Sequence, residues 1–310
     1  MRTILKRVVT LGLLVGIGVL IARREGFDAM GAHLRSLSLG GLALALLVPL
    51  ISVAASVRRW QILLHHEGLE LSYGTLLRSF LRGRFVGAFT PSTTGLDLYR
   101  IVDVAKRTGR KAASGRAILV EKLYGLVALA LVSMLLLPVG LARFFGTVGL
   151  FVAVGLGLGS VLMLVLLARP RLIPFLHVPR IAKIVDVLST RPMLLGTHLR
   201  VLGLGMVSHG AAAATFVGTG IALGVGATPM ELLVVGNAIV LATLVPISVG
   251  GLGVREGTAV AVLATVGVEP SLAALVGFLG YLVIQPPALL GGLLTLRPSP
   301  RTSPGTIPAV

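Results

Sequence analysis

Apolar positions fill long uninterrupted stretches of this chain, and charged positions gather in the segments between them. A transmembrane helix needs about 20 consecutive apolar residues. Stretches of that order without Asp, Glu, Lys or Arg occur at 36–57, 123–142, 144–168, 201–230, 232–254 and 270–296. The alternating pattern of membrane β-strands is absent from the sequence. The pattern therefore predicts an all-α polytopic membrane protein.

The charged loops predict how these helices cross the membrane. Loops rich in Lys and Arg stay on the cytoplasmic side, and the two most basic loops are 100–116 and 169–200. The basic residues near both ends place the N- and C-termini in the cytoplasm as well. Spans consistent with these constraints are expected at about 8–22, 39–57, 117–137, 147–167, 199–223 and 271–293. The first is a signal peptide or an uncleaved span, and the lack of a small-residue cleavage site favours the span.

Two further apolar segments fit no single crossing. Residues 73–101 begin and end inside, and residues 231–268 begin and end outside. We therefore expect two re-entrant helical hairpins, whose irregular tips are tolerated where protein or a wet cavity surrounds them. Residues 1–137 and 147–294 then share one order of elements with opposite starting sides, which is an inverted-topology repeat.

This order predicts the domain organisation. Residues 1–295 are expected to form a single membrane domain. The remaining segment, 296–310, is rich in Pro, Ser and Thr, and we expect it to be a disordered cytoplasmic tail.

Each predicted hairpin carries a similar polar element at its tip. The first is PSTTGLDLYR from position 91, and the second is PISVGGLGVRE from position 246. In both, Pro is followed by Gly four residues later and by Arg nine residues later. Paired interruptions of this kind point to a transport site between repeats. The candidate binding residues are Pro91, Ser92, Gly95, Asp97, Arg100, Glu121, Pro246, Ser248, Gly250, Gly251, Arg255 and Glu256.

The two arginines suit an anionic headgroup, because guanidinium binds phosphate through paired hydrogen bonds. Nine helical residues rise about 13 Å, so Arg100 is expected near the inner leaflet and Arg255 near the outer one, at the two mouths of a shared cavity. Two alternatives stay open. Instead of binding a headgroup, Arg100 is a cytoplasmic anchor that follows the positive-inside rule. Arg255, in the same way, forms an internal ion pair with Glu256 or Glu231.

The other charged residues leave similar choices. Asp97 and Glu256 lie in apolar surroundings, so each is expected to pair with an arginine or to bind a proton. Glu121, followed by Lys122, is a cytoplasmic anchor or part of the cavity wall. Arg78, Arg82 and Arg84 form a candidate basic face for anionic lipid at the inner leaflet.

Composition narrows the function. The chain is 55% hydrophobic and 13% charged, against about 25% charge in ordinary soluble domains. The net charge of +17 follows the loops, so we expect no nucleic-acid partner. There is no Cys, and no Walker lysine loop, zinc His-Glu pattern or nucleophile elbow. We therefore expect neither a cofactor nor an enzymatic activity.

At these motifs the chain resembles the lysylphosphatidylglycerol synthase transmembrane family, also called the flippase-like domain family. The resemblance rests on Arg59-Trp60, the two Pro–Gly–Arg elements and the Glu121 position. It implies a stand-alone member without the soluble synthase, working as a translocator of anionic or aminoacylated phospholipid in the bacterial inner membrane.

Two other functions remain as alternatives. One is an ion-coupled transporter of a small polar solute, and the other is a scaffold for a separately encoded lipid-modifying enzyme. The partners expected are membrane lipids, and the glycine-rich faces fit either a homo-oligomer or internal packing of the repeats.

Overall fold

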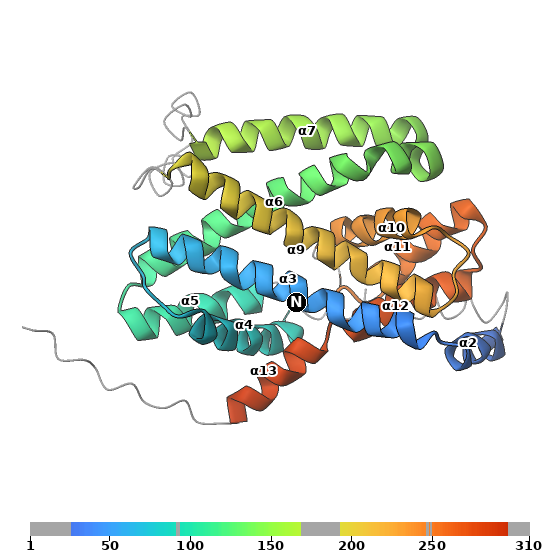
Figure 1. Cartoon of the computed structure of the whole chain (residues 1–310), viewed down its shortest axis with the longest axis horizontal. Helices are drawn as coiled ribbons and strands as arrows, with labels where there is room; N and C mark the ends of the chain where they lie inside the picture. The colour runs from blue at the N-terminus through green and yellow to red at the C-terminus, as the bar shows by residue number, and fades with distance from the viewer. Residues whose placement is uncertain (1–25, 91–93, 169–192, 246–247, 249, 297–310) are drawn as a thin grey trace, which may run out of the picture.

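The computed structural model describes residues 26–90, 94–168, 193–245, 248 and 250–296, and all regular elements in these ranges are helical. Figure 1 presents the arrangement. The predicted span 8–22, the tail 297–310 and three candidate site residues, Pro91, Ser92 and Pro246, lie outside the described residues.

The described helices fall into a long and a short class. The first half contains α2 (Gly26–Arg35), α3 (Leu39–His66), α4 (Tyr73–Ala88), α5 (Thr94–Thr108) and α6 (Lys111–Gly140). A π-helical turn (Leu141–Phe145) leads into α7 (Gly146–Ala168). The second half contains α9 (Leu195–Ala222), α10 (Pro229–Ala242), α11 (Val254–Leu263), a 3₁₀ turn (Ala264–Val266), α12 (Pro270–Val283) and α13 (Pro286–Leu296).

Helices α3 and α9 form the central antiparallel pair. A Cβ atom added at Gly41 would lie 2.3 Å from the backbone nitrogen of Ala222, and one added at Gly218 would lie 2.5 Å from that of Ala45. Small residues at these points let the two backbones approach closely, as is common between membrane helices. The helix pair is therefore in close backbone contact where α3 begins and α9 ends.

The two predicted hairpins are pairs of shorter helices, α4–α5 and α10–α11. They lie toward opposite ends of the α3–α9 pair (Figure 1). Each packs on its own apolar cluster, one around Trp60 and Leu76 and the other around Phe216 and Leu232. The two hairpins are thus separately supported bodies on one central pair of helices.

Four helical stretches in the described part are long and apolar enough to cross a membrane, namely Leu39–His66, Lys111–Gly140, Leu195–Ala222 and Pro270–Leu296. A bent pair of helices over 143–165 brings the number to five. The sequence predicts six spans, of which the first lies outside the described residues. Each of the other predicted spans coincides with a helical stretch.

Two helical stretches differ in extent from the spans predicted for them. The span expected to end at position 57 continues to His66, because Arg59 and Trp60 are buried against other helices rather than exposed at an interface. The last span is not one helix, since α12 ends at Val283 and α13 begins at Pro286. Proline lacks a backbone N–H and its ring disfavours helical geometry before it, so the consecutive prolines at 286 and 287 divide the span.

Candidate functional site: a cavity between the two hairpins

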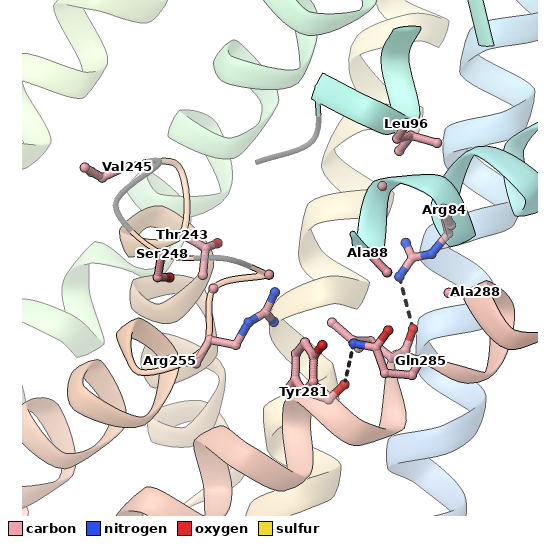
Figure 2. A pocket seen from close by; sticks show the side chains of 14 residues that line it. Arg84, Ala88, Leu96, Thr243, Val245, Ser248, Arg255, Tyr281, Gln285 and Ala288 are labelled. Carbon is pink, nitrogen blue, oxygen red and sulfur yellow. Dashed lines mark hydrogen bonds between the residues drawn. The ribbon is translucent and has the colours of Figure 1, made fainter. Parts of the chain in front are cut away.

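A cavity of about 260 Å³ lies where three parts of the chain meet. Its walls come from the α4–α5 hairpin, the α10–α11 hairpin and the break between α12 and α13 (Figure 2). The lining residues are Arg84, Gly87, Ala88, Leu96, Thr243, Val245, Ser248, Gly250, Gly251, Arg255, Tyr281, Ile284, Gln285 and Ala288. The cavity therefore joins segments that are distant in sequence.

The loop before α11 forms one wall through glycine. Gly250, Gly251 and Gly253 have φ angles of 64°, 77° and 81°, a region that residues with a Cβ atom rarely adopt. The N–H of Gly253 donates to Glu256 Oε2 at 2.6 Å, which caps the first turn of α11. This geometry fixes the start of α11 and so sets the position of Arg255.

Arg255 faces the cavity without an anionic partner. Its guanidinium stacks over the Tyr281 ring at 5.6 Å, and its buried Nε has no hydrogen-bond partner. No carboxylate among the described residues lies within ion-pairing distance of it. Glu231 instead accepts from Arg143 Nε at 2.7 Å, and Glu256 caps its own helix. The ion pair considered for Arg255 in the sequence is therefore not formed within the described part of the chain.

Arg84 approaches the cavity from the opposite wall, so that the two guanidinium groups point toward one another (Figure 2). One nitrogen of Arg84 donates to the Ile284 carbonyl at 3.0 Å, while its buried Nε has no partner. The Ile284 carbonyl is available because the helix stops there. The break in the last span thus supplies the acceptor that holds Arg84 at the cavity.

The sequence analysis missed ten of the lining residues, and those with polar side chains are Arg84, Thr243, Tyr281 and Gln285. Arg82 and Arg84 were assigned to a basic face at the inner leaflet, but Arg82 donates to the Leu294 carbonyl of α13 at 2.8 and 3.2 Å. The signal for the missed wall was present, because a Gln followed by two prolines interrupts an apolar span, and broken helices mark binding sites in transporters.

One protein-family model, described as the lysylphosphatidylglycerol synthase TM region, matches residues 7–291 of the chain. The chain belongs to this family. No curated protein and no solved structure matches it. With its long apolar helices, this family member is a multi-pass membrane protein. Within the described residues, no group of three His, Asp or Glu side chains is placed to hold a metal ion.

In this family member the first Pro–Gly–Arg element has a different environment from the second. Arg100 is only 3% exposed and does not line the cavity. It donates to Asp97 at 2.6 Å and to Glu121 at 2.8 Å, and it stacks on Trp60 at 4.9 Å. Arg59 donates to the other oxygen of Glu121 at 3.2 Å. We name the buried residues Arg59, Asp97, Arg100 and Glu121, together with the exposed Lys122, the ion cluster.

The structure thus divides the predicted site residues between two places. Ser248, Gly250, Gly251 and Arg255 line the cavity, and Glu256 shapes its wall from behind. Asp97, Arg100 and Glu121 belong to the ion cluster, where Lys122 lies 2.6 Å from the second oxygen of Asp97. Gly95 packs tightly, since an added Cβ would lie 2.2 Å from the Thr90 hydroxyl.

Proposed function

We propose that this protein translocates phospholipid across the membrane, with the headgroup entering the cavity between the hairpins while the acyl tails stay in lipid. The observation that carries the proposal is the guanidinium of Arg255 at the cavity wall, whose Nε has no hydrogen-bond partner and which forms no ion pair with a described carboxylate. A charge at membrane depth is costly, so one that lacks a protein partner is expected to serve function. A phosphate provides the paired acceptors that guanidinium prefers. The family match supports a lipid-related role.

The helix positions support an inverted repeat, the architecture in which such a site alternates between two sides. Helices α3 and α9 both have 28 residues, and α9 begins at 195 where α3 begins at 39, an offset of 156. Helix α10 follows α4 by the same offset, from 73 to 229. The hydroxyls of Ser52 and Ser208, again 156 positions apart, contact each other at 3.2 Å. A pseudo-twofold axis through this contact relates the halves in the proposed six-span, two-hairpin arrangement.

The finer features of the proposal follow from the loop charges and the family. The protein works in the bacterial inner membrane with both termini in the cytoplasm. Its substrate is an anionic or aminoacylated lipid of the phosphatidylglycerol type. Catalysis is assigned to no residue of this chain, and a lipid-modifying enzyme is a separate partner.

Scrambling of fluorescent phosphatidylglycerol in proteoliposomes tests the proposal. Wild-type protein is expected to move the lipid, and Arg255→Ala is expected to lose this activity while keeping its helical content and elution volume. Arg107→Ala is the matched control, since Arg107 is exposed on α5 and pairs with Asp103 one turn earlier on its own helix. Wild-type vesicles without scrambling, with or without an ion gradient, would refute translocation.

One observation favours a second function, the ion-coupled transport of a small polar solute. Glu256 is 3% exposed, and its Oε1 is buried without a partner, which suits a group that binds and releases a proton. This alternative predicts uptake of a water-soluble substrate driven by a pH gradient and abolished by Glu256→Gln. Asp97 is a poorer proton carrier, because Arg100 and Lys122 both lie against its carboxylate.

A further inference from the structure

The described lining of the cavity carries two positive charges and no negative one. Arg84 and Arg255 are its charged residues, and the rest are apolar, glycine or neutral polar side chains. Three residues of the neighbouring loop lie outside the described part, at 246, 247 and 249, and the sequence gives Pro, Ile and Val there. No carboxylate therefore lines the described part of the cavity wall, and Glu256 lies behind that wall.

Three buried acidic side chains of the predicted site already make contacts. Asp97 and Glu121 pair with Arg100, Arg59 and Lys122 in the ion cluster. Glu256 Oε2 accepts from the Gly253 N–H, while its buried Oε1 has no hydrogen-bond partner. Asp97 and Glu121 would have to break existing contacts to receive a cation beside Arg255, and Glu256 does not line the cavity.

These charges decide between the two lipids that the proposed function leaves open. A lysyl ester adds ammonium groups to the headgroup, and a buried ammonium requires acceptors and an opposite charge. Beside Arg84 and Arg255 it would find like charges instead, which discriminate strongly against a ligand. A phosphodiester without an amine meets the opposite situation, because its negative charge lies beside two guanidinium groups that have no carboxylate within ion-pairing distance.

We infer that the cavity selects a phosphate-bearing headgroup of net negative charge without an ammonium group. Resting on the proposed function, this means that the protein carries unmodified phosphatidylglycerol and rejects the lysyl derivative named in its family's description. The neutral polar residues Thr243, Ser248 and Tyr281 suit the hydroxyls of a small polyol beside the phosphate. The volume of about 260 Å³ equals that of roughly nine liquid water molecules.

The transport test compares fluorescent phosphatidylglycerol with its lysyl derivative in proteoliposomes of one composition. Wild-type protein is expected to move the unmodified lipid more than about tenfold faster, the factor that corresponds to about 1.4 kcal/mol. Equal rates, or a faster lysyl derivative, would overturn the selectivity while leaving translocation intact. Movement of neither lipid would overturn the proposed function instead.

A binding test in detergent examines headgroup selectivity separately from translocation, and it works even when no transport is seen. Calorimetry would compare short-chain phosphatidylglycerol, short-chain phosphatidylethanolamine and inorganic phosphate on wild type and on Arg84→Gln. Selectivity predicts binding of phosphatidylglycerol over the ethanolamine lipid, and weaker binding to the variant. Binding of inorganic phosphate alone would show that a soluble phosphate rather than a lipid headgroup is the ligand. Equal binding of both lipids would contradict the inference.

A variant that adds a negative charge to the cavity tests the same electrostatic explanation of selectivity. Gln285 lines the cavity, and its backbone carbonyl accepts from the N–H groups of Ala288 and Leu289 at the first turn of α13. Its side-chain amide donates to the Tyr281 carbonyl at 3.2 Å. Gln285→Glu adds a carboxylate of the same shape at a helix start, where negative charge is tolerated. It is expected to shift the ratio of rates toward the lysyl lipid by about tenfold. Gln285→Met, which removes the amide without adding charge, is the control, and an equal shift in both variants would refute the electrostatic explanation.

Discussion

Removing the carboxylate at the centre of the ion cluster is the sharpest perturbation of the fold. Glu121 is 4% exposed, and its two oxygens accept from Arg59 and Arg100 separately, at 3.2 and 2.8 Å. Glu121→Gln keeps the side-chain shape but leaves one of the two guanidinium groups without a charged acceptor. The described cluster then holds three cations against the single carboxylate of Asp97.

The expected loss of stability follows from burial. Breaking a buried ion pair by removing one partner costs about 3–5 kcal/mol, because the remaining charge stays buried without compensation. Asp103→Asn is the matched control, since Asp103 pairs with Arg107 one turn away at a more exposed position. Helical pairs of that kind contribute about 0.3–0.5 kcal/mol. The two carboxylate-to-amide changes should therefore differ several-fold in their effect.

Reversible unfolding in mixed micelles, followed by circular dichroism, measures both free energies. The result expected is a clear drop in the unfolding midpoint for Glu121→Gln and almost none for Asp103→Asn. If Glu121→Gln costs no more than the control, the ion cluster does not stabilise the fold. The substrate role assigned to Arg100 and Glu121 in the sequence would then be the better explanation of their burial.

Two further predictions concern the helix contacts around the site. Gly41→Ala is expected to destabilise the α3–α9 pair by about 1–3 kcal/mol, whereas the neighbouring Gly40→Ala, with only the Ser38 hydroxyl at 3.9 Å, is expected to be neutral in the same unfolding assay. Hydrogen bonding from the Thr228 backbone, with Arg143 nearby, holds the pKa of Glu231 below its ordinary value of 4.5. The ionised Glu231 carboxylate therefore contributes its full stabilisation above pH 4.5, and this contribution is lost as the pH falls through the lowered pKa. In the Glu231→Gln variant, the midpoint of thermal melting should depend less on pH across that acidic range.

The sequence predicts the positions of the helices well, because these positions depend on the length of the apolar stretches and on the charged loops between them. The hairpin beginning at Tyr73 and the span beginning at Leu39 start where the apolar patterns start. Hydropathy averages over a window, however, so it passed over the two-residue interruption between α12 and α13. The positive-inside rule likewise predicts a membrane side for Arg84, but it does not predict which way the Arg84 side chain points from its helix. That direction depends on the Ile284 carbonyl, which becomes available only when the distant helix breaks.

The matched Pro–Gly–Arg elements predict matched sites, and the structure gives them different surroundings for a reason that the sequence contains. In the proposed repeat, the offset of 156 pairs Glu121 on α6 with Gly277 on α12. The carboxylate that pairs with Arg100 in one half is then replaced by a glycine in the other, where an added Cβ would lie 2.8 Å from the Glu256 Cα. An arginine with a carboxylate on the following long helix is expected to be held internally, and one without it is expected to remain available to a ligand. Comparing the long helices after the motifs, rather than the motifs themselves, would have distinguished Arg100 from Arg255.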